Sequence, residues 1–207
     1  MSGRPDHGCL FDIASDQSGF FTADQAHIWG FNWRMLLYHA RQGRFRHIRR
    51  GLYRLRDFPA SPHEEVVAVW LAAGRASAVI SHESALDLLD LADIIPDAIH
   101  LTAPRSRRGL TVPLGARVHT SSAALRPDEV VMVDGIRVTA AARTIIDVTE
   151  ADLAPDQVER AVANALARGT ATEDELREQG SRRGRRVADQ IDGVLPRVRQ
   201  RATAGSS

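Results

Sequence analysis

Hydrophobic and polar positions follow two different periods in the first part of the chain. Apolar residues recur at helical spacing within residues 23–29 and 32–42, and Gly30 separates these two segments. Within residues 44–55 apolar residues instead recur at about every second position. Because helices repeat every 3.6 residues and strands every two, the pattern predicts a helix, a turn, a second helix and a hairpin.

The second of these helices is predicted to begin after Asn32, a favourable N-cap, and to end before Gly43. Its core-facing side would consist of Trp33, Leu36, Leu37 and Ala40. The opposite side would carry Arg34, Met35, Tyr38 and Gln42, with Arg41 beside them. Arginine binds guanine edges or phosphates and glutamine binds adenine, so this side has the donors that reading a DNA groove requires.

The predicted hairpin is strongly basic. Its inward side would be formed by Phe45, Tyr53 and Leu55. Its outward side would be formed by Arg44, Arg46 and Arg54, with Arg49 and Arg50 at the tip. Gly51 lets the tip turn with a positive φ.

Residues 34–56 hold eight arginines and no carboxylate. A helix-turn-helix followed by a cationic hairpin is typical of a winged helix-turn-helix, which lays one helix in the major groove. We therefore expect contacts to double-stranded DNA from Arg34, Tyr38, Arg41, Gln42, Arg44, Arg46, Arg49 and Arg50. The alternative is an amphipathic helix with a solvated polar side, next to a surface hairpin without a ligand.

The remainder of the chain alternates strand and helix signals. Strands are predicted at residues 78–80, 99–102, 117–120, 130–133 and 136–138, and helices at 63–73, 81–91, 139–149, 156–168, 172–180 and within 181–201. The expected fold class is α/β of the α+β type, with a winged helix-turn-helix followed by a mixed α/β domain and carboxy-terminal helices. The proline-containing segment 57–62 is the predicted linker between domains 1–56 and 63–207.

Local signals support several of these boundaries. Thr22, Ser81 and Thr139 are candidate N-caps, and Thr172 and Glu175 form a predicted capping box. A first helix is predicted at residues 9–15, with apolar side chains available for the core of the amino-terminal module: Leu10, Phe11, Ile13 and Ala14. Asp134-Gly135 predicts a two-residue hairpin turn.

Charge and composition narrow the possible functions. Residues 57–100 hold eight acidic residues and one arginine, so the basic module is followed by an acidic body. The 27 lysine and arginine positions are all arginine, which excludes a Walker A lysine and a Schiff-base lysine. The single cysteine, Cys9, fits a reducing compartment. The longest apolar run, residues 66–74, is far shorter than the ~20 residues of a membrane span, so we expect a cytoplasmic protein without a membrane partner.

Candidate catalytic chemistry is weak. The run Ser81-His82-Glu83-Ser84 looks like a catalytic cluster, but a serine N-cap followed by a first-turn glutamate is ordinary helix chemistry. Arg143 and Asp147 are expected to form a structural ion pair at i, i+4. The eight histidines are scattered in sequence and show no metal-ligand spacing. We therefore expect no catalytic residue, no metal site, no cofactor and no enzymatic activity.

Two further basic regions are possible secondary surfaces: Arg105, Arg107 and Arg108, and then Arg182, Arg183, Arg185 and Arg186. The second region lies in segment 181–201, which also has an apolar stripe. It is either a docked terminal helix or another surface for DNA, RNA or an acidic partner.

Four stretches in this order resemble the AbiEi family of antitoxins from bacterial type IV toxin–antitoxin pairs. They are Gly19-Phe20-Phe21-Thr22, Arg50-Gly51-Leu52-Tyr53, Ser81-His82-Glu83-Ser84-Ala85-Leu86, and Gly135-Ile136-Arg137-Val138-Thr139 followed by Arg143-Thr144-Ile145-Ile146-Asp147. The exclusive use of arginine is similar to that of actinobacterial members.

The resemblance implies an amino-terminal winged helix-turn-helix that represses its own operon at operator repeats. It also implies an α/β domain that neutralises a nucleotidyltransferase-like toxin, with or without binding it directly. Two alternatives stay open on the residues alone. One is a metal-dependent nuclease that uses carboxylates within residues 83–147, and the other is a protein-binding or RNA-binding body that acts on the toxin through Arg182–Arg186.

Overall fold

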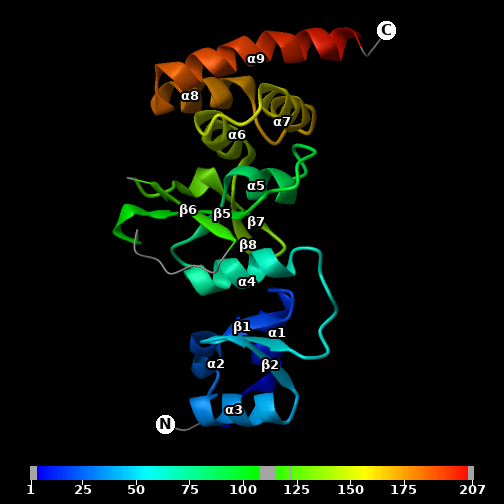
Figure 1. Ribbon diagram of the computed structural model, residues 1–207, viewed down its shortest axis with the longest axis vertical. Coiled ribbons are helices and arrows are strands. Elements are labelled where there is room, and N and C mark those ends of the chain that lie inside the picture. Colours follow the sequence, from blue (N-terminus) through cyan, green and yellow to red (C-terminus); the bar gives the residue numbers. More distant parts are fainter. Residues whose placement is uncertain (1–3, 108–114, 122, 205–207) are drawn as a thin grey trace. The chain divides into compact units, whose positions relative to one another are not determined.

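The computed structural model describes residues 4–107, 115–121 and 123–204. The chain divides into two compact units (Figure 1). The first contains the described residues up to Ala78 together with the turn 134–136, and the second contains the others. The first unit thus includes the helix that follows the segment 57–62.

Four helices and a three-stranded sheet form most of the described part of the first unit. The elements are α1 (His7–Ser15), β1 (Phe20–Thr22), α2 (Ala23–Ile28), α3 (Trp33–Arg41), β2 (Phe45–Arg49), β3 (Leu52–Leu55) and α4 (Glu64–Ala73). Two predicted caps are confirmed: the Thr22 side chain accepts from the Gln25 amide in a full capping box, and the Asn32 side chain accepts from the Met35 amide at 3.0 Å. The helix-turn-helix and hairpin predicted from periodicity are therefore present.

The sheet has the strand order β1-β3-β2, so β3 is central. Both pairings are antiparallel, with Phe21 opposite Tyr53 and Phe45 opposite Leu55. These four side chains lie on the face that packs against α1, α2 and α3. Phe21 is fully buried and its ring stacks on that of Tyr53 at 5.7 Å. The inward side predicted for the hairpin is thus confirmed.

The buried stripe of α3 differs from the predicted one. Leu36 and His39 are buried, whereas Trp33 is 69% exposed and Leu37 is 39% exposed. At about 100° per residue, the midpoint between Leu36 and His39 lies about 90° around the helix from Trp33 and about 130° from Leu37, so a buried side centred there leaves both of these side chains exposed. His39 fits the core as a ring that packs near Phe31 and Phe45, and burial lowers its pKa.

Arg54 is also placed differently from the prediction. It points away from the inward side, but it is only 4% exposed because α4 packs on that second face of the sheet. Its guanidinium donates to Glu64 Oε1 at 2.5 Å and to the Pro59 carbonyl at 2.9 Å, and it lies over the Phe20 ring. Alternation alone could not distinguish a solvated outer face from one covered by a later helix.

The second unit contains a mixed five-stranded sheet with the order β6-β5-β4-β8-β7. Its strands are β4 (Val79–Ile80), β5 (Ile99–Pro104), β6 (Ala116–Ser121), β7 (Val130–Val133) and β8 (Ile136–Thr139), and the 3-10 helices are η1 (Arg105–Arg107) and η2 (Pro127–Glu129). The predicted turn at Asp134-Gly135 joins β7 to β8, and both residues have positive φ, as a type I′ turn requires.

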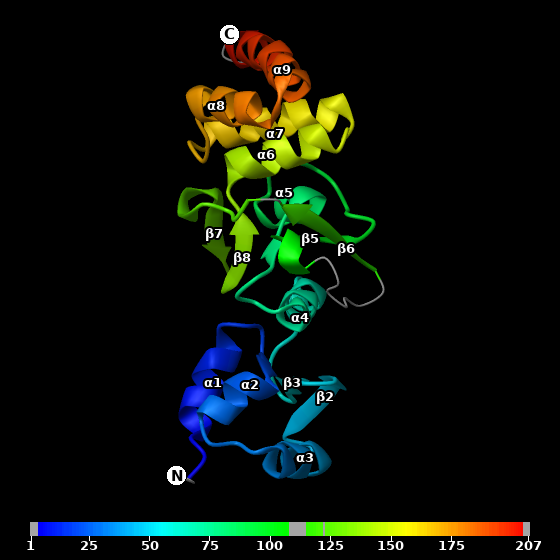
Figure 2. The same cartoon turned by 90° about the vertical axis from the view of Figure 1, so that its left-hand side faces the viewer.

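Five helices complete this unit: α5 (His82–Leu88), α6 (Ala141–Glu150), α7 (Pro155–Ala167), α8 (Glu173–Arg183) and α9 (Arg185–Ala204). Both views show α5 between the sheet and the layer of α6 to α9 (Figures 1 and 2). The core of this layer includes Ile145, Val162, Leu176 and Ile191, all fully buried. The apolar stripe of the last segment is thus a docked terminal helix.

Four smaller expectations are corrected by the structure. Ala140, not Thr139, is the N-cap of α6, because the Thr139 hydroxyl pairs with Thr144 Oγ1 at 2.7 Å. Ser81 occupies the predicted N-cap position of α5 but makes no capping bond. Phe11, expected in the core, is 53% exposed, and α8 continues past Gly180 to Arg183.

Arg54 and Arg46 are opposite one another on neighbouring strands, but Arg54 is buried and Arg46 is exposed. This difference leads to a first prediction. Arg54→Ala should lower the free energy of unfolding by about 1.5–3 kcal/mol, because it removes the buried guanidinium that bonds to the partly exposed Glu64 carboxylate and to the Pro59 carbonyl. Arg46→Ala is the matched control, since Arg46 is the exposed cross-strand neighbour of Arg54, and a change within about 0.5 kcal/mol is expected. Urea unfolding measures both variants, and equal effects would contradict the structural role of Arg54.

Candidate nucleic-acid interface and polar pocket

The exposed side of α3 combines basic and apolar groups. Trp33, Arg34, Leu37, Tyr38 and Arg41 are all exposed and share one helix face. The Arg34 guanidinium lies 5.8 Å from the centre of the Trp33 ring, a cation–π contact that orders it. Gln42, the C-cap of the helix, is exposed at its end.

The hairpin formed by β2 and β3 lies next to α3 in the fold. Arg44, Arg46 and Arg50 are exposed on it, and Arg49 is half-buried beside a register shift in β2. Gly51 turns the tip with φ +74°.

None of the six arginines predicted to bind DNA forms an ion pair with a carboxylate among the residues that the structure places. They are Arg34, Arg41, Arg44, Arg46, Arg49 and Arg50. Their charges therefore remain available to an external anion. We call these six arginines, with Tyr38 and Gln42, the basic face. Those of α3 project from the exposed side of that helix, and Arg44 and Arg46 alternate with Phe45, so they project from the side of the sheet opposite α3.

The carboxy-terminal arginines are different, because each is matched by a carboxylate within its own unit. Arg182 pairs with Glu178, Arg185 with Asp189, and Arg186 with Asp152 at 2.5 Å. Arg183 bonds to both Asp147 and Glu150 and is half-buried. This region therefore contributes less free positive charge than its sequence suggests.

The other predicted secondary surface is only partly described. Arg105 is exposed at the start of η1, and the backbone of Arg107 ends this short helix. Arg108 lies outside the described residues.

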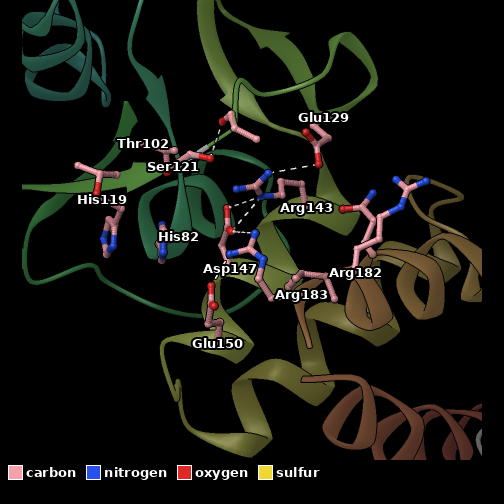
Figure 3. A pocket seen from close by; sticks show the side chains of 14 residues that line it. His82, Thr102, His119, Ser121, Glu129, Arg143, Asp147, Glu150, Arg182 and Arg183 are labelled. Carbon is pink, nitrogen blue, oxygen red and sulfur yellow. Dashed lines mark hydrogen bonds and ion pairs between the residues drawn. The ribbon is translucent and has the colours of Figure 1, made fainter. Parts of the chain in front are cut away.

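A polar pocket of about 530 Å³ opens in the second unit between the ends of β5 and β6 and the helices α5, α6 and α8. Figure 3 shows His82 and His119 at one end of it, with charged side chains around Arg143 and Asp147 at the other. The sequence did not predict this pocket, because its lining comes from segments far apart in the chain.

The charged end is organised by Asp147, which is only 1% exposed. Arg143 Nε donates to both of its carboxylate oxygens at 2.9 and 3.0 Å, and Arg183 donates to Oδ1 at 2.6 Å. Arg143 also reaches Glu129 Oε1 at 3.2 Å. Burial raises the pKa of Asp147, and the two guanidinium groups act in the opposite direction. The predicted Arg143–Asp147 pair is therefore confirmed as part of a larger network.

The other end of the pocket brings together histidines that the sequence analysis interpreted as scattered. The rings of His82 and His119 stack with their centres 3.5 Å apart, and His119 Nε2 lies 3.1 Å from His100 Nδ1. Burial, followed by the neighbouring imidazoles, lowers the pKa of His82 to about 2 and that of His119 to about 4. The pKa of His100 is also lowered, mainly by burial.

Neighbouring hydroxyl groups hold this cluster. Ser81 Oγ makes no capping bond because it lies 2.9 Å from His82 Nδ1 and accepts from Thr102 Oγ1 at 2.8 Å. One signal in the sequence could have drawn attention to the cluster: His100 and His119 lie in predicted strands that follow one another along the chain. In the structure His119 is opposite Thr102, two residues from His100. Only the parallel pairing of β5 and β6 brings the two rings together.

The first unit thus has the fold and the charged face of a winged helix-turn-helix, the class of DNA-binding transcriptional regulators. Residues 10–56 match the family described as "Transcriptional regulator, AbiEi antitoxin". The resemblance predicted from the sequence is therefore confirmed for this amino-terminal module, and the match supports a role as a DNA-binding regulator of the antitoxin class.

The whole chain also resembles a solved structure, the crystal structure of the Rv2827c protein from Mycobacterium tuberculosis. The TM-score is 0.60 at 12% sequence identity, and the match covers 94% of this chain and 78% of that one. At this identity the likeness shows the fold alone. A search of curated proteins found no significant match.

No helix within residues 4–107, 115–121 or 123–204 is long and apolar enough to cross a membrane.

The Asp147 network leads to a second prediction. Asp147→Asn should lower the free energy of unfolding by about 1.5–3 kcal/mol, because Arg143 and Arg183 would lose the buried carboxylate that they share and would keep only Glu129 and Glu150 as partners. Asp189→Asn is the control: Asp189 is exposed and pairs with an almost fully exposed Arg185, so a change within about 0.5 kcal/mol is expected. Denaturant unfolding followed by circular dichroism compares the two, and a stable Asp147→Asn protein would contradict the prediction.

Proposed function

We propose that this protein is an antitoxin that binds operator DNA and represses its own operon, and that its second unit neutralises a nucleotidyltransferase-like toxin. The observation that carries the DNA-binding part is the basic face. Its six arginines on α3 and the adjoining hairpin have no ion pair within residues 4–107, 115–121 and 123–204, whereas Arg182, Arg183, Arg185 and Arg186 are paired. Unpaired guanidinium groups do not lose an internal partner when they bind phosphate, so they favour a polyanion.

In this proposal α3 enters the major groove and the hairpin contacts the backbone beside it. Arg34 and Arg41 contact base edges or phosphates, and Gln42 contacts adenine. Arg44, Arg46, Arg49 and Arg50 neutralise phosphates, and Tyr38 donates a hydrogen bond to one.

The unexpected exposure of Trp33 and Leu37 adds to this picture. Both lie on the same helix face as Arg34 and Arg41. Apolar side chains in the major groove contact the methyl group of thymine, which is the one apolar feature of that groove. We assign Leu37 this role and Trp33 the positioning of Arg34.

The nuclease alternative is less well supported by the site. Asp147, the carboxylate most central to the pocket, is bonded to two guanidinium groups and is 1% exposed. A catalytic metal ion needs carboxylate oxygens that are free to bind it. The family match at residues 10–56 also favours a regulator over an enzyme.

Binding to the fragment upstream of its own gene tests the DNA-binding proposal. The affinity should fall steeply with salt, and Arg50→Ala should reduce the slope of log K against log[salt] by about one. Gln42→Ala should reduce the preference for the operator over unrelated DNA by about 1–3 kcal/mol. Fluorescence anisotropy across a salt series measures both.

The control is Arg185→Ala, which removes the same charge from an exposed but paired position and should leave DNA binding unchanged. If the wild-type protein shows no preference for its own promoter at moderate salt, operator binding is wrong. If Arg185→Ala and Arg50→Ala weaken binding equally, the basic face is not the binding site.

Toxin neutralisation is tested by co-expression with the neighbouring toxin gene. An Arg46→Ala, Arg50→Ala variant should lose repression and still restore growth, because the two activities are assigned to separate units.

Size-exclusion chromatography of the protein mixed with the toxin distinguishes direct binding from indirect antagonism. A charge reversal of Arg182, Arg185 and Arg186 is suited to this test because Arg183 must be kept for the Asp147 network. Growth that stays arrested with the wild-type protein would contradict the antitoxin assignment.

A further inference from the structure

Three imidazole rings from three different elements converge at one end of the polar pocket. His82 is the first residue of α5, His100 lies in β5 and His119 lies in β6. One ring nitrogen from each can be chosen so that all three lie within 4.8 Å of one another. His82 and His100 are buried and His119 is half-buried, so the cluster is sheltered but reaches the pocket through His82 and His119.

The spacing of the nitrogens matches that of ligands around one ion. His100 Nδ1 and His119 Nε2 lie 3.1 Å apart. Two imidazole nitrogens bound to tetrahedral Zn²⁺, each at about 2.0–2.1 Å, are separated by about 3.3 Å. A small movement therefore converts this contact into a pair of ligands.

A hydroxyl group behind His82 and a carboxylate near His100 lie on the sides of the rings where the supporting groups of metal-bound histidines are found. His82 Nδ1 contacts Ser81 Oγ at 2.9 Å, which leaves its Nε2 for an ion. His100 Nε2 lies 3.8 Å from Asp97 Oδ1 and has no hydrogen-bond partner among the residues that the structure describes. A carboxylate or hydroxyl on the far nitrogen is the usual support of a metal-bound imidazole.

The backbone of His82 adds an independent observation. Among the described non-glycine residues, five have a positive φ: Ser18, His82, Asp90, Asp134 and Asp152. Of these, only His82 is buried, with φ +53° at the start of α5. A buried residue in this conformation carries strain that the surrounding structure must offset, and such positions are concentrated at functional sites.

We propose that His82, His100 and His119 bind one divalent transition-metal ion of the zinc class, with a fourth coordination position open to the pocket. An all-imidazole set favours Zn²⁺, Co²⁺, Ni²⁺ or Cu²⁺ over Mg²⁺ or Ca²⁺, which prefer oxygen ligands. Binding requires one of the two stacked rings, His82 or His119, to turn about its Cβ–Cγ bond. The bound ion links α5 to β5 and β6.

The test uses the full chain carrying Cys9→Ser, because the free thiol of Cys9 would bind the same probes. After dialysis against a chelator and then against chelator-free buffer, Co²⁺ is added and its visible absorption is recorded. We expect one equivalent to give the intense bands of a tetrahedral ion, and Zn²⁺ to displace it. Zn²⁺ should also raise the thermal midpoint, since an ion that binds only the folded state stabilises it.

Variants identify the ligands. His82→Gln and His119→Gln should each weaken Zn²⁺ binding by more than about 100-fold, and Asp97→Asn by about 10-fold, as for a partner behind a ligand. His47→Gln, at an exposed histidine of the first unit, is the matched control and should bind as the parent does. Far-ultraviolet circular dichroism identifies any variant that does not fold. If one of the two ligand variants fails to fold, the other still tests the proposal.

The neighbouring set Glu83, Asp97 and His100 is the competing site, since its ligand atoms also lie within 4.8 Å of one another. Glu83→Gln distinguishes the two, because it should leave binding unchanged under our proposal. Loss of binding in Glu83→Gln with retention in His82→Gln and His119→Gln would overturn the proposal. So would the absence of any stoichiometric Co²⁺ or Zn²⁺ binding by the parent protein.

Discussion

The buried carboxylate of Asp147 is the interaction on which the second unit depends. It joins α6 to α8 through Arg183 and, through Arg143, reaches Glu129 at the end of η2, directly before β7. A buried charge is tolerated only when partners satisfy it, so the helices and the sheet edge must keep one relative arrangement. The charged end of the polar pocket owes its geometry to that arrangement.

Arginine has two opposite uses in this chain. In the second unit, guanidinium groups bond to carboxylates and hold helices together, as Arg183 and Arg186 do. On the basic face of the first unit they have no such partner among the residues that the structure describes. Arg54 shows that the distinction depends on the environment and not on sequence proximity, because it is paired with Glu64 while its cross-strand neighbour Arg46 has no ion pair within the described part of the chain. The pairing pattern therefore indicates function better than the number of arginines does.

Much of the fold was predictable from local signals. Caps at Thr22 and Asn32, the turn at Asp134-Gly135 and the change of period near residue 44 all act within a few residues, so the sequence displays them directly. The errors have a common origin. The buried stripe of α3 and the burial of Arg54 depend on which later element covers a face, and periodicity does not contain that information.

The sequence by itself determined the order of helices and strands, the absence of lysine, the basic character of residues 34–56 and the likeness to the AbiEi antitoxins, because these are properties of neighbouring residues. The tertiary structure alone decided that Trp33 and Leu37 face solvent, which arginines are paired, and that His82, His100 and His119 meet. The three histidines are separated by 18 and 19 positions, and the parallel register of β5 and β6 is what closes that distance. Contacts of this kind are set by the packing of the whole unit, so no local pattern records them.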